Sequence, residues 1–334
     1  MKPKKYIVIT SIFNPTLAIE KFAKLLDYNL IVVGDNKTPK DWNFKGANFY
    51  SVTKQEELSF DILKELPYNH YCRKMLGYIL AANNGADFIV DTDDDNIPKK
   101  FWEFPTFEGS FIKIDGGLGF VNTYQFYTNK KIWPRGLPLD LISKNFELDS
   151  KHKIEDCKVG VWQGLADEDP DVDAIYRLTN DSPCYFKNKP PIVLGMGTLS
   201  PFNSQNTIFR KELFLLMYLP ATVTFRFTDI LRSIVAQPIM WLYGFQLGFT
   251  NATVTQKRNP HDYFKDFISE VPMYISSHEL INIISKKLSK DKSIQENLYV
   301  AYECLLKAGI VQPHELVVLK AWLIDMGVTT KQLF

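Results

Sequence analysis

The chain has 334 residues, and its 39 basic and 38 acidic residues leave a formal net charge of +1. This balance, without a basic stripe, excludes a typical nucleic-acid-binding protein. Hydrophobic residues make up 46% of the chain and charged residues 23%, which excludes a disordered chain and indicates one large or two smaller globular domains. The four cysteines stand far apart with no CxxC pair, so we expect free thiols in a reducing compartment rather than a zinc knuckle.

The hydropathy pattern gives no sign of a membrane span. No stretch reaches about 18 uninterrupted apolar residues, and the nearest one, Ile230–Phe249, contains Arg232 and Gln237. The first residues, Met1–Lys5, run directly into a strand-like segment and lack the apolar core of a signal peptide. We therefore expect a cytoplasmic chain, with a peripheral position at a membrane as the alternative.

Short apolar strands alternate with helical segments in the first third of the chain. We expect strands at 6–10, 30–33, 48–52 and 88–90, and helices at 17–26 and 70–83. This alternation predicts an α/β fold with a mostly parallel, doubly wound sheet, whose ligands bind at the carboxyl ends of the strands. Three polar clusters follow strands and should share that edge of the sheet: Thr10–Pro15, Gly34–Lys37 and Asp91–Asn96.

The rest of the chain gives a weaker signal until its last part. The middle is rich in Pro, Gly and aromatic residues, with strands expected at Gly117–Val121 and Ala174–Leu178. Helical periodicity then covers 213–218, 228–244, 279–288, 294–307 and 313–326. We therefore expect two parts, an α/β domain over 1–273 and an α-helical C-terminal extension over 274–334.

The most informative motif is the acidic run Asp91-Thr92-Asp93-Asp94-Asp95 at the end of a strand. At an effective dielectric constant near 20, two like charges about 4 Å apart cost about 4 kcal/mol. A divalent cation would relieve this repulsion, and carboxylate oxygens suit Mg²⁺ or Mn²⁺. The alternative is a solvated acidic turn or a helix N-cap before Pro98.

Four further residues are candidates for the same site. Arg73 and Lys74 begin a predicted helix that points to the acidic edge, where they could bind a diphosphate or simply be surface cations. Asp229 falls in the first turn of the helix predicted at 228–244, where helix-dipole effects alone also favour an acid. His261 could be a metal ligand or an ordinary histidine.

Several well-known motifs are missing from the sequence. It contains no GxGxxG, P-loop, HExxH or GxSxG segment. This argues against a dinucleotide oxidoreductase, a P-loop ATPase, a zinc protease and an α/β-hydrolase.

Over residues 5–260 the chain resembles the STELLO family of glycosyltransferase-like proteins. The matching segments are Ile9–Thr16, Val32–Asp35, Tyr68–Tyr78, Asp91–Asp94, Trp133–Leu139, Gln163–Gly164, Pro170–Asp173, parts of Gly197–Thr207 and of Leu219–Gly244. More distantly, the chain is similar to the reversibly glycosylated polypeptides, which include UDP-arabinopyranose mutases. That likeness rests on Asp93–Asp95, Arg135–Pro138 and Asp229.

The resemblance implies a GT-A type fold, in which an α/β domain binds a nucleotide sugar beside a DxD metal site. The implied metal ligands are Asp93 and Asp95, with His261 as the candidate third ligand, and Asp229 is implied as the general base or as the group that orients the sugar. The remaining donor-binding residues are Thr10 and Asp35 at the base, Arg73 and Lys74 at the diphosphate, Asp91 near the metal and ribose, Arg135 and Asn203 at the sugar, and Arg232.

Two positions depart from the STELLO pattern. The family typically has Arg where this chain has Asp95, so the metal geometry here is expected to follow the mutase-like pattern. The family also places a His where this chain has Thr255, six residues before His261.

We therefore expect a Mn²⁺- or Mg²⁺-dependent glycosyltransferase. It would transfer a hexosyl or pentosyl group from a nucleotide-diphosphate sugar, UDP by resemblance, to a glycan or lipid-linked hydroxyl, with inversion or retention left open. Two alternatives stand beside it. One is a nucleotide-sugar mutase that needs no acceptor, and the other is a non-catalytic partner of a polysaccharide synthase. The C-terminal helices would then contact the synthase or a second copy of the chain.

Overall fold

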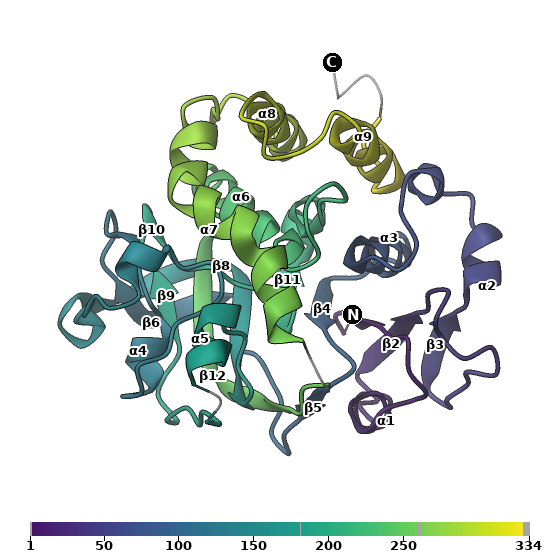
Figure 1. Cartoon of the computed structure of the whole chain (residues 1–334), viewed down its shortest axis with the longest axis horizontal. Coiled ribbons are helices and arrows are strands. Elements are labelled where there is room, and N and C mark those ends of the chain that lie inside the picture. The colour runs from purple at the N-terminus through teal and green to yellow at the C-terminus, as the bar shows by residue number, and fades with distance from the viewer. Residues whose placement is uncertain (1, 181, 260–261, 330–334) are drawn as a thin grey trace.

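The computed structural model describes residues 2–180, 182–259 and 262–329. In this part of the chain, a ten-stranded sheet runs in the order β3-β2-β1-β4-β11-β8-β6-β9-β12-β5, with helices on both faces (Figure 1). The predicted α/β class with helices at the C-terminal end is confirmed. All four cysteines are free thiols, as predicted.

The first half of the sheet is parallel and follows the predicted alternation. Strands β1 (Lys5–Thr10), β2 (Tyr28–Val33), β3 (Ala47–Tyr50) and β4 (Phe88–Thr92) pair in parallel. The helices between them are α1 (Leu17–Phe22), α2 (Val52–Glu56) and α3 (Met75–Asn83), with 3₁₀ turns η1 (Asp61–Lys64) and η2 (Tyr71–Lys74). The order 3-2-1-4 matches the first four strands of a doubly wound nucleotide-binding sheet.

The second half of the sheet is mixed. Strand β11 (Asn206–Arg210) runs antiparallel between β4 and the long β8 (His152–Glu168), and β12 (Gln246–Gln256) lies parallel to β8. The other strands here are β5 (Asn96–Pro98), β6 (Glu108–Ile114) and β9 (Ile192–Leu194), and β7 (Gly119–Phe120) pairs separately with β10 (Thr198–Leu199). The strand predicted at Gly117–Val121 is present as the short β7.

Alternating side chains of each central strand enter two hydrophobic layers. In β1, Ile7 and Ile9 face the layer under α1, and Val8 faces the layer under α3. Helix α3 approaches β1 so closely that a Cβ on Gly77 would lie 2.4 Å from Cγ1 of Val8. This close packing places the end of β4 and the start of η2 beside each other.

One predicted element is wrong. Residues Ala174–Leu178 form the start of helix α5 (Ala174–Thr179) rather than a strand. The side chain of Asp173 accepts a hydrogen bond from the backbone N–H of Tyr176, and this N-cap outweighs the strand propensity of the segment. The neighbouring helices are α4 (Tyr124–Tyr127) and the 3₁₀ turns η3 (Leu139–Leu141) and η4 (Leu148–Ser150), and the helix expected at 213–218 is the 3₁₀ turn η5 (Lys211–Met217).

The C-terminal helices begin earlier than expected and pack into the main core. The long helix α6 (Thr228–Leu242) precedes β12, and α7 (Tyr263–Ser285) contains the expected domain boundary at 273. Helices α8 (Ile294–Lys307) and α9 (Glu315–Asp325) follow along one edge of the molecule (Figure 1). Both share the larger hydrophobic cluster with α3 and α6.

Hydrogen bonds from backbone N–H groups to two carboxylates also join α9 to the rest of the fold. Glu315 accepts bonds from the backbone N–H groups of Ala221 and Thr222, at 3.0 and 2.8 Å. Asp325 accepts from the N–H groups of Asp61 and Ile62. Within the described residues, no helix has the length and apolar character needed to cross a membrane.

Candidate functional site

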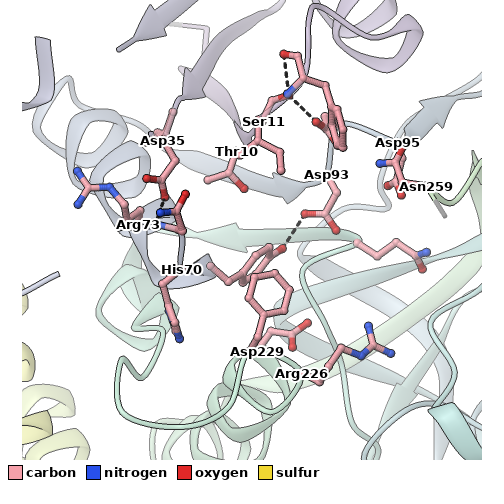
Figure 2. Close-up of a pocket in the computed structure, with 18 of the residues that line it drawn as sticks. Thr10, Ser11, Asp35, His70, Arg73, Asp93, Asp95, Arg226, Asp229 and Asn259 are labelled. Carbon is pink, nitrogen blue, oxygen red and sulfur yellow. Dashed lines mark hydrogen bonds between the residues drawn. The ribbon is translucent and has the colours of Figure 1, made fainter. Parts of the chain in front are cut away.

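A cavity of about 420 Å³ opens at the carboxyl ends of β1, β2 and β4. This volume falls in the usual range of small-molecule sites. All three polar clusters expected at this edge contribute to its lining. Figure 2 shows Asp35 at one end of the cavity, Asp229 and Arg226 at the other, and Asp93 between them.

The end of the cavity near β1 and β2 contains Thr10 and Asp35, as predicted. Asp35 accepts hydrogen bonds from the backbone N–H groups of Asn36 and Asn69, both at 2.7 Å, which hold the carboxylate in place. Two aromatic rings at the rim are unusually exposed, Phe13 by 44% and Phe225 by 51%. Exposed flat rings are suited to stack on a nucleobase or a sugar face.

The first carboxylate of the acidic run lies beneath the cavity. Asp91 is fully buried, and its oxygens form ion pairs of 2.7 Å with Lys74 Nζ and with Arg232. Burial is the largest influence on Asp91 and raises the pKa, but the two cations together lower it by more, so the pKa of Asp91 lies below its usual value. Asp91 therefore stays ionised as part of a buried network.

This network gives Lys74 and Arg232 a different place from the expected one. Lys74 Nζ also donates to the carbonyl of Thr92 at 2.6 Å and to Asp93 at 2.9 Å, which leaves it no N–H for a ligand. Arg232 donates to Ser204 Oγ at 3.1 Å. Neither side chain lines the cavity, and both neutralise the acids from below.

Arg73 reaches the cavity wall, but its guanidinium points into the protein. It donates to Gln55 Oε1 and to the carbonyl of Leu66, and it lies 4.2 Å from the ring centre of Tyr68. Since these contacts engage both terminal nitrogens, the sequence-based expectation that Arg73 binds a diphosphate gains no support from its geometry.

Asp93 and Asp95 do line the cavity. Asp93 Oδ1 accepts bonds from Tyr71 Oη at 2.6 Å and from Lys74. Asp95 Oδ2 accepts from Gln256 Nε2 at 3.0 Å, and its buried Oδ1 has no hydrogen-bond partner among the described residues. Burial, and then the charges of Asp93 and Asp94, raise the pKa of Asp95 to about 7.

These two carboxylates fit the expected divalent cation. The buried, unpartnered Asp95 Oδ1 is the kind of atom that a cation would satisfy, and Mg²⁺ is usually held by one or two carboxylates together with waters and substrate phosphates. In the described part of the chain, no group of three or more His, Cys, Asp or Glu side chains is placed to hold a metal ion. His261, the third expected ligand, lies outside the described residues.

The other end of the cavity is built around Arg135. Its guanidinium contacts both oxygens of Asp171, at 2.7–3.1 Å, and both oxygens of Asp229, at 2.9 Å. Gly136 makes this possible, because its φ is +91° and a Cβ there would lie 2.4 Å from Cγ2 of Ile230. The glycine lets the Arg135 loop reach the first turn of α6, where Asp229 lies.

Both oxygens of the Asp229 carboxylate are therefore fixed by hydrogen bonds. Its Oδ2 accepts a further bond from the backbone N–H of Ser204 at 3.2 Å, and its Oδ1 accepts from the N–H of Ile230 at 3.1 Å. Asn203, also expected at the sugar, lies beside it in the wall and is held by Gln163 Oε1 through its backbone N–H. A carboxylate paired on both oxygens is better suited to orient a hydroxyl group than to remove its proton.

The structure adds residues that the sequence analysis missed. Arg226, Gln256, Arg258 and Asn259 also line the cavity, and Figure 2 labels Arg226 and Asn259 among the lining residues. Asp171 belongs to a segment already matched to the STELLO pattern, but only the fold reveals Arg135 as its partner.

Comparisons with known proteins show which family the sequence resembles. A family model described as STELLO glycosyltransferases matches residues 226–332. Two Arabidopsis thaliana proteins, probable glycosyltransferase STELLO1 and probable glycosyltransferase STELLO2, are 25% and 27% identical to the chain, and each alignment covers 97% of it. In sequence, the chain is therefore similar to STELLO glycosyltransferases. This STELLO-like chain spans 44% and 45% of the length of those two relatives.

The STELLO likeness extends beyond the 5–260 expected from the motifs, because the family model continues through α7, α8 and α9. A crystal structure of a mycobacterial protein also aligns, with a TM-score of 0.41 and 13% identity, over 83% of this chain and 74% of that one. That likeness is too distant to carry an argument.

Proposed function

We propose that this STELLO-like chain is a glycosyltransferase that uses a nucleotide-diphosphate sugar. The observation that carries the proposal is the buried, unpartnered Asp95 oxygen beside Asp93, in a cavity at the carboxyl ends of parallel strands. A nucleotide fits this edge because ligands of doubly wound sheets bind there. The family resemblance supplies the sugar-transfer chemistry.

In this proposal Asp93 and Asp95 hold Mg²⁺ or Mn²⁺, which would neutralise charge on the diphosphate leaving group. Lys74 keeps part of the acidic run neutral without the ion, since it pairs with both Asp91 and Asp93. That leaves Asp95 as the carboxylate whose charge most needs a cation.

The donor would lie along the length of the cavity. Its base, uracil by family resemblance, would occupy the end near Thr10 and Asp35, and its sugar would lie near Asn203 and Asp229. Arg135 holds both oxygens of the Asp229 carboxylate in place, so Asp229 would accept a hydrogen bond from a sugar hydroxyl and hold the sugar in one orientation. The hydroxyl acceptor, a glycan or a lipid-linked sugar, would approach from the same end.

A thermal-shift panel tests the donor site directly. UDP, GDP and CDP, with their common sugars, are each added with Mn²⁺, Mg²⁺ or EDTA, because a ligand that binds only the folded chain raises the melting temperature. We expect one nucleotide to stabilise the chain and EDTA to remove that effect. No shift with any nucleotide would overturn the proposal and favour a non-catalytic partner.

Product analysis then separates transferase from mutase. With donor alone, a mutase converts the nucleotide sugar between its pyranose and furanose forms, whereas a transferase leaves the sugar isomer unchanged. Isomerisation of the donor without release of free nucleotide would contradict the transferase assignment.

A further inference from the structure

Four arginines gather at the sugar end of the cavity, and three of them have carboxylate partners. Arg135 pairs with Asp171 and Asp229, as described above. The other two pairs are Arg226 with Glu270 at 2.8 Å and Arg177 with Asp169 at 2.6 Å.

The fourth, Arg258, is different. Its Nε and one terminal guanidinium nitrogen are buried and have no hydrogen-bond partner among the described residues, although the side chain lines the cavity. Burial, and then the positive charges of Arg226 and Arg177, lower the pKa of Arg258 to about 10, and Asp171 offsets this only in part. Leaving two buried guanidinium nitrogens without an acceptor is costly, so the site favours an anionic ligand that could accept from them.

Backbone contacts fix where this group lies relative to the metal site. Arg258 follows β12, and the preceding residue, Lys257, donates its backbone N–H to the carbonyl of Asp95 at 3.1 Å. From there the Arg258 side chain interacts with Arg226, Arg177 and Asp171, which lie on the sugar side. Arg258 thus stands between the carboxylates proposed to hold the cation and the ion pairs around Asp229.

We propose that Arg258, with Arg226 beside it, binds an acidic group, a carboxylate or a phosphate, on the sugar side of the substrate. The inference rests on the proposed function and narrows its substrate class. The acidic group could belong to the donor, as in a uronic-acid nucleotide sugar, or to the acceptor, as in a sugar phosphate. A guanidinium recognises both through paired, charge-assisted hydrogen bonds.

Binding measurements by calorimetry in the presence of Mn²⁺ distinguish the two sources. The donor arm compares UDP, UDP-glucose and UDP-glucuronate, and the acceptor arm compares glucose with glucose 6-phosphate on the UDP-saturated chain. If the panel above selects another nucleotide, its own neutral and acidic sugars replace these probes. In one of the two arms we expect the acidic ligand to bind at least about tenfold tighter than the neutral one.

The variant Arg258→Gln should abolish that preference and leave the affinity for the nucleotide alone within about twofold. Lys257→Gln is the matched control, because it removes the same charge from the exposed neighbouring residue and should change neither. Arg258→Lys keeps the charge without the paired donors and should retain part of the preference. The melting temperatures of the three variants show that each is folded.

Two results would overturn the inference. In one, the wild-type chain has no preference for an acidic group in either arm. In the other, Arg258→Gln weakens the binding of the nucleotide and of the neutral nucleotide sugar as much as that of the acidic ligand. Arg258 would then be a ligand of the diphosphate instead. A chain that binds no nucleotide at all would reject the proposed function itself, which is a separate and recognisable outcome.

Discussion

Asp91 and Asp95 belong to one run of five residues, yet they have opposite electrostatic surroundings in the fold. Asp91 lies under the cavity, ion-paired with Lys74 and Arg232. Asp95 lies in the cavity wall, where a single amide is its side-chain partner and one buried oxygen has none in the described chain. The two carboxylates therefore differ in pKa, below the usual value for Asp91 and about 7 for Asp95.

This contrast assigns the two carboxylates different roles: Asp91 stabilises the fold, and Asp95 is placed to bind a ligand. A buried carboxylate shared by two cations stabilises the fold, and removing it leaves both cations uncompensated. An unpaired carboxylate in a cavity destabilises the ligand-free fold while it is ionised, and either protonation or a bound cation removes that cost. The variants below test the contrast in order of expected effect.

Replacing Asp91 with Ala should have the largest effect. The substitution leaves Lys74 and Arg232 buried without this carboxylate, and we expect a loss of about 3–5 kcal/mol in the free energy of unfolding. Urea denaturation followed by circular dichroism measures it. As a matched control, Asp87→Ala, at the half-buried residue just before the same strand, removes a surface pair with Lys211 and a hydrogen bond from the Lys4 backbone N–H, and should cost about 1–2 kcal/mol. Equal losses in the two variants would refute the structural role of Asp91.

The variant Asp229→Asn tests the other paired carboxylate. It keeps the shape and one acceptor oxygen but removes the charge that Arg135 holds, so we expect the rate of nucleotide release from the donor sugar to fall about 10²-fold. Nucleotide binding should be unchanged, because Asp229 lies at the sugar end. A larger fall that also removes the low-pH limb of the pH–rate profile, where a general base becomes protonated and inactive, would instead identify Asp229 as the general base.

The variant Asp95→Asn should leave the fold intact and weaken the binding of the cation and the nucleotide. Without this carboxylate charge, we expect Mn²⁺-dependent nucleotide affinity to fall at least about tenfold, or 1.4 kcal/mol. Thermal shifts with and without EDTA report the change. Unchanged cation-dependent binding would remove Asp95 from the metal site.

The smallest expected effect is on the pH dependence of stability. The pKa of Asp95 is raised from 3.8 to about 7 on folding, so the folded chain holds the proton more tightly than the unfolded one. Stability is therefore lost as pH rises through 7, by about 1.4 kcal/mol between pH 6 and 8 for this one group. Melting curves of the cation-free chain across that range should show it.

Asp94 contributes to the same titration at lower pH. Burial raises its pKa to about 6, even though Ser11 donates a hydrogen bond to the carboxylate. In the variant Asp95→Asn, the melting temperature should no longer change with pH above 6.5. Its pH dependence below 6.5 should stay as in the wild-type chain. A wild-type chain whose stability increases from pH 6 to pH 8 without a cation would contradict the raised pKa.

Much of the fold was predictable because it depends on local pattern. Apolar runs of three to five residues between helical segments predicted β1, β2 and β4, and helix α8 was predicted at its observed bounds. Elements that depend on tertiary context were missed. The long strand β8 carries polar residues along its exposed first half, and the segment at Ala174 became a helix through its Asp173 cap.

The candidate site likewise has residues that the sequence could place and residues that it could not. The acidic run, Thr10 and Asp35 could be placed at one sheet edge from the sequence, because the carboxyl ends of parallel strands meet there. The partners of Asp229 could not be, since Arg135 lies 94 positions away along the chain. Lys74 was expected near the acids but as a ligand-binding cation, because its burial is invisible in the sequence.

The sequence by itself therefore determined the α/β class, the polar edge of the sheet and the concentration of negative charge at the end of β4. These follow from residue periodicity and from the short spacing of like charges. Only the tertiary structure decided which charges are paired and which stay open. A side chain's pKa and its free hydrogen-bonding atoms depend on burial and on neighbours brought from distant segments, and packing sets both: it buries Asp91 between two cations and leaves Asp95 and Arg258 facing the cavity.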